Sequence, residues 1–150
     1  MPGLYFEEFS VGQTVKTAGR TISEDAIFSF AGLTGDYNQI HTDAEFARKT
    51  QFGQRIAHGL LGLSIATGLI MQTGLLEGTV LAFREINEWK FVKPFFIGDT
   101  INAELTIKET KPLPRIGAGA LIAEVVVKNQ RDEVCQRGML NLLMLSKPKA

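Results

Sequence analysis

The pattern of apolar and polar positions changes about halfway along the chain. Residues 59–76 (GLLGLSIATGLIMQTGLL) contain no charged residue and are apolar on nearly every face, which is typical of a helix enclosed by protein. From residue 80 onward the pattern favours strands instead. Residues 101–108 (INAELTIK) alternate cleanly between apolar and polar side chains, as a strand with one buried face does. The chain is therefore expected to form a buried helix followed by a sheet.

Turn signals divide the second half of the chain into strands. The prolines and glycine of residues 112–117 mark one turn, and NQRD at 129–132 marks another before a last strand that ends near residue 146. Connections this short favour antiparallel pairing. Four strands are expected here, and residues 13–22 (QTVKTAGRTI) are interpreted as a further strand, so the sheet should have about five.

Two short helices are predicted between the first strand and the buried helix. Ser23 is a good N-cap residue with acidic residues directly after it, and Gly35 should end this helix. Thr42 and Glu45 have capping-box spacing, so a second short helix should begin just after His41. The order of elements predicts the α+β class: an antiparallel sheet wrapped around a central helix, in one domain over residues 1–150.

Composition excludes several classes of function and leaves a soluble, cytoplasmic protein as the expectation. The formal net charge is zero and no run of Lys or Arg is present, so nucleic acid is not an expected partner. The first residues lack the pattern of a signal peptide, and the single Cys135, interpreted as a core residue, fits a reducing compartment. Residues 59–76 have about the minimum length of a membrane span, but their glycines and polar residues favour a helix buried in protein.

The stretch TGDYNQIH, residues 34–41, contains candidate acid–base chemistry. Asp and His are common general acid–base partners because their protonation states can be tuned near neutral pH. Asp36 and His41 are five residues apart, so they do not align on a helix and only a folded-back loop could bring them together. Asn38 could orient either partner or bind a water. An ordinary turn, in which Asp and Asn bond their own backbone, is the preferred interpretation of this stretch alone.

A second stretch, AHGL at residues 57–60, strengthens the chemical interpretation. Gly59 would stand at the start of the buried helix, where free N–H groups and the helix dipole favour negative charge. A glycine lets a carbonyl group approach closely, and an N–H aimed at a developing oxyanion contributes about 3 kcal/mol in a transition state. His58 could line such a site or serve only a structural role. Gly59, Gly62 and Ala66 would form a stripe of small residues against which a sheet could pack.

Three motifs together resemble a known family. G-D-x-N-x-x-H at 35–41, A-H-G-L at 57–60 and FVKPFFIGDTI at 91–101 are similar, in order and spacing, to the MaoC-like family of hot-dog-fold (R)-specific enoyl-CoA hydratases. The similarity runs over nearly the whole chain. It implies a hot-dog fold, a long helix wrapped by an antiparallel sheet. It also implies homodimers or higher homo-oligomers with sites at the subunit interface.

The resemblance also implies roles for individual residues. Asp36 and His41 would be the catalytic dyad, Asn38 would belong to the same motif, and the Gly59 N–H would polarise a thioester carbonyl. His58 and Thr67 are carried as further candidates for substrate binding, Thr67 because related sequences often have a small hydroxyl residue there. No metal or cofactor is implied. One departure is visible, because the family usually has proline where this chain has Gln39.

The implied activity is the reversible addition of water to a trans-2-enoyl thioester. The substrate would be an acyl-CoA or an acyl-carrier-protein thioester. Two alternatives stay open at the level of sequence: a hot-dog thioesterase, which hydrolyses the thioester instead, and a non-catalytic acyl-CoA-binding subunit. Neither acyl length nor the physiological direction follows from the residues.

Overall fold

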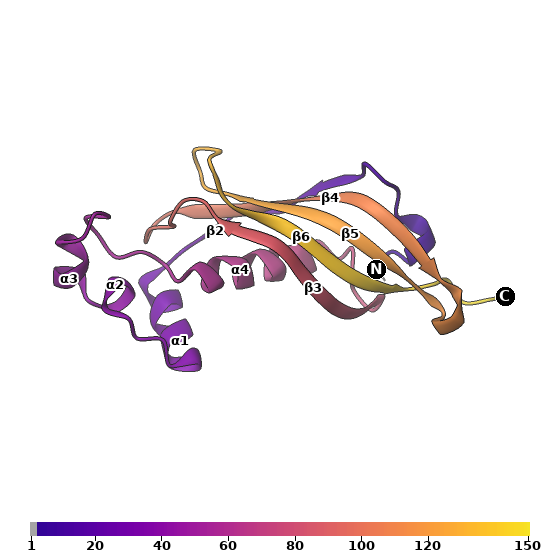
Figure 1. Ribbon diagram of the computed structural model, residues 1–150, viewed down its shortest axis with the longest axis horizontal. Coiled ribbons are helices and arrows are strands. Elements are labelled where there is room, and N and C mark those ends of the chain that lie inside the picture. The colour runs from indigo at the N-terminus through magenta and orange to yellow at the C-terminus, as the bar shows by residue number, and fades with distance from the viewer. Residues whose placement is uncertain (1–2) are drawn as a thin grey trace.

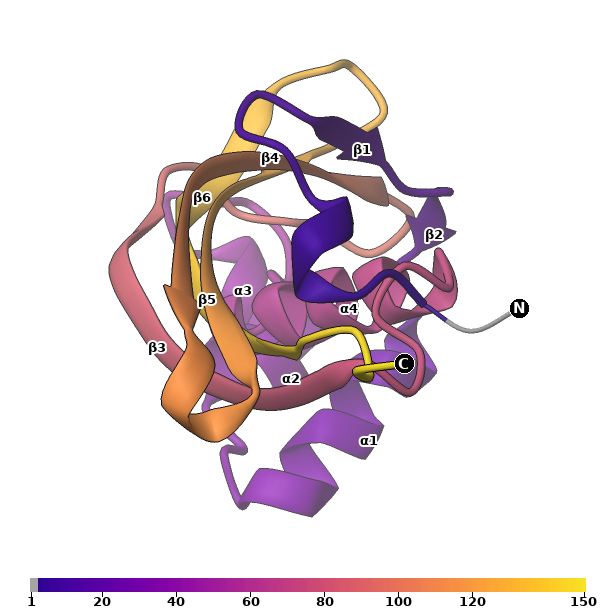
Figure 2. The ribbon, with the colours of Figure 1, turned by 90° about the vertical axis from the view of Figure 1, so that its right-hand side faces the viewer.

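A curved antiparallel sheet wraps around one long helix in the computed structural model, which describes residues 3–150 (Figure 1). The helix is α4 (Gly59–Gln72). The long strands are β3 (Val80–Phe91), β4 (Thr100–Leu113), β5 (Ala118–Lys128) and β6 (Val134–Leu145). They lie in the order β4-β5-β6-β3, and Figure 2 shows the sheet curving over α4. The predicted α+β arrangement is confirmed.

The predicted first strand is two short strands. β1 (Thr14–Lys16) and β2 (Arg20–Thr21) both pair with β4, so the sheet has six strands where about five were expected. Between them the chain passes close to β4, because a Cβ on Gly19 would lie 3.0 Å from the Thr100 side chain. The weak alternation of residues 13–22 reflects this interruption.

The long strands follow the predicted alternation, with one difference in their bounds. Ile101, Ala103 and Ile107 are buried and their neighbours in β4 are not. β4 continues to Leu113, so Pro112 lies inside a strand rather than in the predicted turn. The turn is η2 (Pro114–Ile116), closed by Gly117 at φ 63°. Pro112 is tolerated because β1 and β2 pair only with the earlier part of β4, which leaves the last residues without a neighbour on that side.

Three short helices precede α4 and gather at one end of the molecule in Figure 1: α1 (Glu24–Thr34), α2 (Gln39–Thr42) and α3 (Ala44–Arg48). A short 3₁₀ helix, η1 (Phe6–Glu8), lies near the N-terminus. The Ser23 side chain caps α1, and Gly35 ends it at φ 80°, as predicted. The N-cap of α3 is Asp43, not Thr42, because the Asp43 carboxylate accepts the Phe46 N–H. His41 lies within the single turn of α2 rather than in an irregular segment.

The core forms where α4 packs into the curve of the sheet. Ile65, Ala66 and Leu69 are almost fully buried on α4. The small-residue stripe serves close packing as expected, because a Cβ on Gly62 would lie 2.6 Å from Gln136 and 2.9 Å from Phe95. Cys135 is fully buried, in agreement with the core interpretation, and burial raises the pKa of its thiol. Within residues 3–150, no helix has the length and apolar character that crossing a membrane requires.

Candidate active site

Backbone hydrogen bonds bring the three sequence motifs together. Each of the two residues before His58 forms a backbone hydrogen bond to a distant segment. The Ile56 N–H donates to the Ile40 carbonyl at 3.2 Å, and the Ala57 N–H donates to the Phe95 carbonyl at 2.8 Å. Ile40 belongs to the first motif and Phe95 to the third. The start of α4 therefore lies between α2 and the loop that leads into β4, although these segments are distant in sequence.

His41 is buried beside this junction, and one hydrogen bond orients its ring. Its Nδ1 lies 2.7 Å from the Ile56 carbonyl oxygen. A carbonyl can only accept, so Nδ1 carries the proton and Nε2 keeps a lone pair. Burial lowers the pKa of His41 below its ordinary value of 6.5, an effect that the bond to Ile56 partly offsets. His41 is therefore a neutral imidazole at neutral pH, with Nε2 free to accept a proton.

Asp36 lies beside the two histidines but is itself exposed. One of its carboxylate oxygens and one ring nitrogen each of His41 and His58 lie within 4.8 Å of one another. Its Oδ1 also accepts the Asn38 N–H at 3.2 Å. The Asn38 amide oxygen in turn accepts the Ile40 N–H and caps α2. The turn interpretation of this stretch is thus confirmed for the backbone, and the same turn places an acid next to His41. Asn38 is exposed and caps the helix that carries His41.

His58 ties the loop of Asp36 to the start of α4. It is 2% exposed, and its Nε2 donates to the Asp36 backbone carbonyl at 2.9 Å. Its ring stacks on that of His41, with centroids 3.9 Å apart. The hydrogen bond and the stacking contact both support a structural role for His58, which was the alternative to lining the site. Within residues 3–150, Asp36, His41 and His58 are the one group whose ligand atoms lie close enough together to hold a metal ion, although one ring nitrogen of each histidine already bonds a backbone carbonyl.

A cavity of about 520 Å³ opens beside His41 and Gly59. Its walls are mainly apolar. They comprise His41, Phe52, Ile56, Ala57, Gly59, Leu60, Phe91, Val92, Lys93, Pro94, Phe95 and Gln136. Among residues 3–150 the Gly59 N–H has no hydrogen-bond acceptor, as expected of the first residue of a helix. A Cβ at this position would lie 2.8 Å from the Phe91 ring, so Gly59 is required for close packing.

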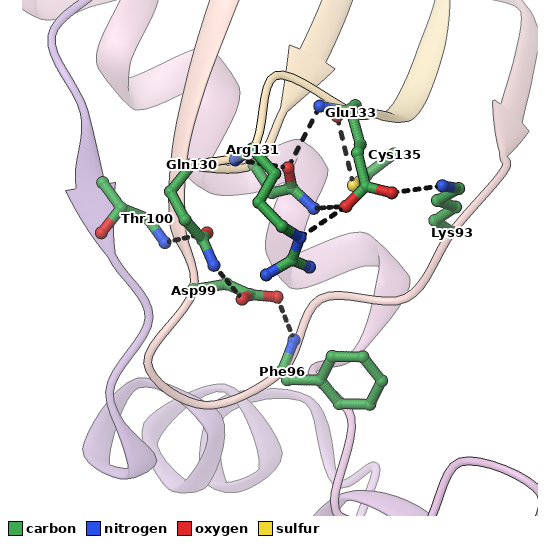
Figure 3. A network of polar contacts seen from close by, with 9 residues as sticks. Lys93, Phe96, Asp99, Thr100, Gln130, Arg131, Glu133 and Cys135 are labelled. Atoms are coloured by element: carbon green, nitrogen blue, oxygen red, sulfur yellow. Dashed lines mark hydrogen bonds and ion pairs between the residues drawn. The ribbon is translucent and has the colours of Figure 1, made fainter.

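The third motif shapes one wall of this cavity through the polar network drawn in Figure 3. The Asp99 carboxylate accepts the Phe96 N–H at 2.8 Å and the Gln130 amide at 2.8 Å, which folds the loop back on itself. Lys93, on the cavity wall, forms an ion pair with Glu133. The hydrogen bonds that Glu133 accepts, above all from Lys93, lower its pKa to about 2. The network thus holds the segment of Lys93 and Phe95 against the cavity.

Thr67 lies in a different place from the other candidates. It is on the second half of α4, where its hydroxyl donates to the Ser64 carbonyl at 2.7 Å. It lines a second, apolar cavity of about 280 Å³ between α4 and strands β3 and β6. Within this chain Thr67 is therefore not part of the cavity that contains His41.

Phe91 and Gln136 contact Gly59 in the cavity and were not singled out from the sequence. Phe91 belongs to the third motif but is one of ten phenylalanines, so composition gave no reason to choose it. Gln136 interrupts an apolar strand (VCQRGML), and a polar residue in such a strand was the available signal. It is 2% exposed and faces α4.

Comparison with known proteins shows the family to which the chain belongs. The model of the family described as "MaoC like domain" matches residues 7–129, which contain all three motifs. The chain belongs to the MaoC-like domain family. Its antiparallel sheet wrapped around one helix is the hot-dog fold. The resemblance seen in the sequence is thereby confirmed.

Two curated members of the family and one solved structure are similar to this MaoC-like chain. It is 38% identical over 104 residues to protein MaoC of Klebsiella aerogenes, covering 69% of this chain but only 30% of that protein. It is 35% identical over 108 residues to an (R)-specific enoyl-CoA hydratase of Rhodospirillum rubrum, covering 72% of each. The X-ray structure of a monoamine oxidase regulatory protein from Archaeoglobus fulgius is 38% identical to this chain with a TM-score of 0.91, covering 99% of this chain and 98% of that one.

Proposed function

We propose that this protein catalyses the reversible addition of water to a trans-2-enoyl thioester, giving a 3-hydroxyacyl thioester. The observation that carries the proposal is the tautomer of His41. The bond from Nδ1 to Ile56 leaves the Nε2 lone pair free, within a cavity that also contains the start of α4. A general base and an oxyanion donor facing one apolar cavity are the groups that hydration of an activated double bond requires.

In the proposed mechanism the thioester oxygen accepts a hydrogen bond from the Gly59 N–H. This interaction withdraws electron density from the β-carbon. A water held between Asp36 and His41 attacks that carbon, and His41 Nε2 accepts the proton of the water. Asp36 takes this proton from His41 and delivers it to the α-carbon, so both residues return to their starting protonation states. Acid–base assistance of this kind contributes about 10²–10⁴-fold to the rate.

The substrate class follows from the walls of the cavity and from the relatives. Phe52, Phe91 and Phe95 provide apolar surface for an acyl chain. Relatives of this chain are named (R)-specific enoyl-CoA hydratase and 3-hydroxybutyryl-CoA dehydratase. Coenzyme A is therefore the proposed carrier, and the (3R) configuration of the product is proposed from the relatives alone.

The test is hydration of crotonyl-CoA, followed as loss of enoyl absorbance. Asp36→Asn and His41→Gln each preserve size and remove proton transfer, so each should lower kcat by about 10²-fold or more. Glu45→Gln is the matched control, because this exposed residue of α3 forms an ion pair with the exposed Arg48 and is not among the residues that line the cavity of His41. Full turnover in both dyad variants, with folding intact, would show that the assignment is wrong. Release of free thiol from a saturated acyl-CoA would favour the thioesterase alternative, and tight binding without turnover would favour a binding subunit.

We also propose that the active form is a homodimer joined through β3. Within residues 3–150 this strand pairs with β6 alone and so lies at the edge of the sheet. Its side chains Leu81, Phe83 and Ile86 are between 45% and 52% exposed. An exposed apolar edge strand is a template for pairing with another strand, and an antiparallel pair of identical strands satisfies two-fold symmetry.

A further inference from the structure

Gln136 is a buried amide that connects β6 to the first residue of α4. Its Nε2 donates to the Gly59 carbonyl at 2.9 Å. Its Oε1 accepts the indole N–H of Trp89, on β3, at 3.3 Å. The side chain is 2% exposed and lines the cavity of His41. Buried polar groups are costly unless paired, and here both ends of one amide are paired to different elements.

The backbone of β3 is distorted where Trp89 turns inward to reach Gln136. The pairing of β3 with β6 shifts register between Asn87 and Lys90, and Glu88 has φ 53°. The left-handed region is uncommon for a residue other than glycine. Trp89 then lies over Gly138, where a Cβ would come within 2.6 Å of the indole ring and 2.9 Å of the Trp89 Cα. A bulge and a glycine on the neighbouring strand thus accommodate the one tryptophan of the chain.

Gly62 brings α4 into direct contact with the same amide. A Cβ on Gly62 would lie 2.6 Å from the Gln136 Nε2, so the helix surface touches Gln136 one turn after the hydrogen bond to Gly59. Gln136 therefore holds α4 in two ways, by a bond to its first carbonyl and by contact with its first turn. Neither interaction involves Asp36 or His41.

We propose that Gln136 is a positioning residue that orients Gly59 for its role as oxyanion donor. Gly59 has to lack a side chain because the Phe91 ring lies against it, and a glycine has the least conformational restraint of any residue. The bond from Gln136 to the Gly59 carbonyl supplies the missing restraint, and Trp89 fixes Gln136 in turn. An oxyanion donor is effective only when it is preorganised, and small misplacements of reacting groups cost rate steeply. This inference rests on the proposed hydratase function.

The test replaces Gln136 with methionine, which has similar length and cannot donate to Gly59. With crotonyl-CoA, Gln136→Met should lower kcat by about 10-fold with KM changed less than about 2-fold, because an oxyanion interaction is stronger in the transition state than in the ground state. Arg137→Gln is the matched control: it changes the next residue of β6, which is exposed. Binding of unreactive butyryl-CoA should alter Trp89 fluorescence in the wild type and in Arg137→Gln, and much less in Gln136→Met.

A folded Gln136→Met variant with wild-type kcat overturns the proposal, as does an equal loss of kcat in Arg137→Gln. If Gln136→Met does not fold, Trp89→Phe carries the test, since it removes the restraint on Gln136 and leaves the Gly59 bond; an unchanged kcat in that variant also overturns it. Failure of the hydratase function is a different result, because the wild type would then hydrate no enoyl-CoA. In that case the amide and carbonyl NMR shifts of Gly59 test the contact: no change between wild type and Gln136→Met contradicts it.

Discussion

His41 is the residue whose chemistry depends most on its neighbours. The Ile56 carbonyl selects its tautomer, and burial lowers its pKa. The stacked ring of His58 acts in the same direction, because a positive charge on one ring disfavours a positive charge on the other. Burial and the His58 ring keep Nε2 unprotonated under the conditions in which a general base has to act, and the Ile56 carbonyl fixes the proton on Nδ1.

The lowered pKa of His41 predicts the pH dependence of the reaction. Hydration needs neutral His41, so kcat/KM should rise with pH through an apparent pKa below 6.5 and then stay level near neutrality. A pH–rate profile with crotonyl-CoA measures this value. An apparent pKa above 6.5 would contradict the assignment of His41 as a buried, neutral base.

The lowered pKa of His41 also makes the stability of the folded chain fall at acidic pH. Above pH 6.5 His41 is neutral in both the folded and the unfolded chain, so its titration does not reduce the free energy of unfolding. As the pH falls below 6.5 the unfolded chain takes up the proton first, and stability is lost until the pH reaches the lower pKa of the folded state. Removal of the titrating ring by His41→Gln should reduce this part of the acid destabilisation.

At the scale of elements, α2 carries the one visible departure from the family pattern. Gln39 is the first residue of this four-residue helix. Among the described residues its N–H has no acceptor, and Asn38 before it has ψ 130°, which a following proline permits. The absence of proline therefore leaves the helix intact, since the Asn38 cap and the backbone bond to Ile56 still define it.

Gln39→Pro should stabilise the protein by about 0.4–1 kcal/mol, because proline restricts the unfolded chain and is favoured at the first position of a helix. Thermal or urea unfolding of the variant measures the difference. Gln39→Ala is the control, as it shortens the side chain without restricting the backbone. A lower stability of the proline variant would mean that the Gln39 N–H or its φ is needed in another conformation.

At the scale of the whole molecule, residues 3–150 leave the edge formed by β3 and the apolar cavity beside it uncovered. Leu81 and Phe83 line that cavity together with Thr67. A second copy paired along β3 would cover both the edge and these side chains. The proposed dimer thus accounts for apolar surface that a single chain exposes.

Sedimentation or light scattering should find a dimer in the wild type and a monomer in Leu81→Lys/Phe83→Lys, because two lysines on the edge strand oppose pairing. Ile116→Lys is the matched control, since Ile116 is 58% exposed in the turn after β4 and its replacement also removes exposed apolar surface. The dimer proposal fails if the wild type is a monomer at assay concentration, or if the double variant stays dimeric.

Local signals gave most of the elements correctly. The Ser23 cap, the αL residue Gly35 and the alternation of residues 101–108 each depend on contacts within a few residues, so they could be predicted from the chain alone. Two of the errors occurred where distant contacts decide. The first strand breaks where it crosses β4, and Pro112 stays in a strand because that part of β4 has one neighbour. The third error is local: Asp43 caps α3, while the Thr42 hydroxyl donates to the Tyr37 and Asn38 carbonyls instead.

The sequence by itself determined which chemical groups are available: a carboxylate and an imidazole five residues apart, a glycine at a helix start, and one long apolar helix. These depend on residue identity and short-range periodicity. Only the tertiary structure decided how the groups are arranged, because the deciding partners are distant in sequence. Ile56 selects the tautomer of His41, the Asp36 carbonyl holds His58, and Gln136 restrains Gly59 from 77 residues away.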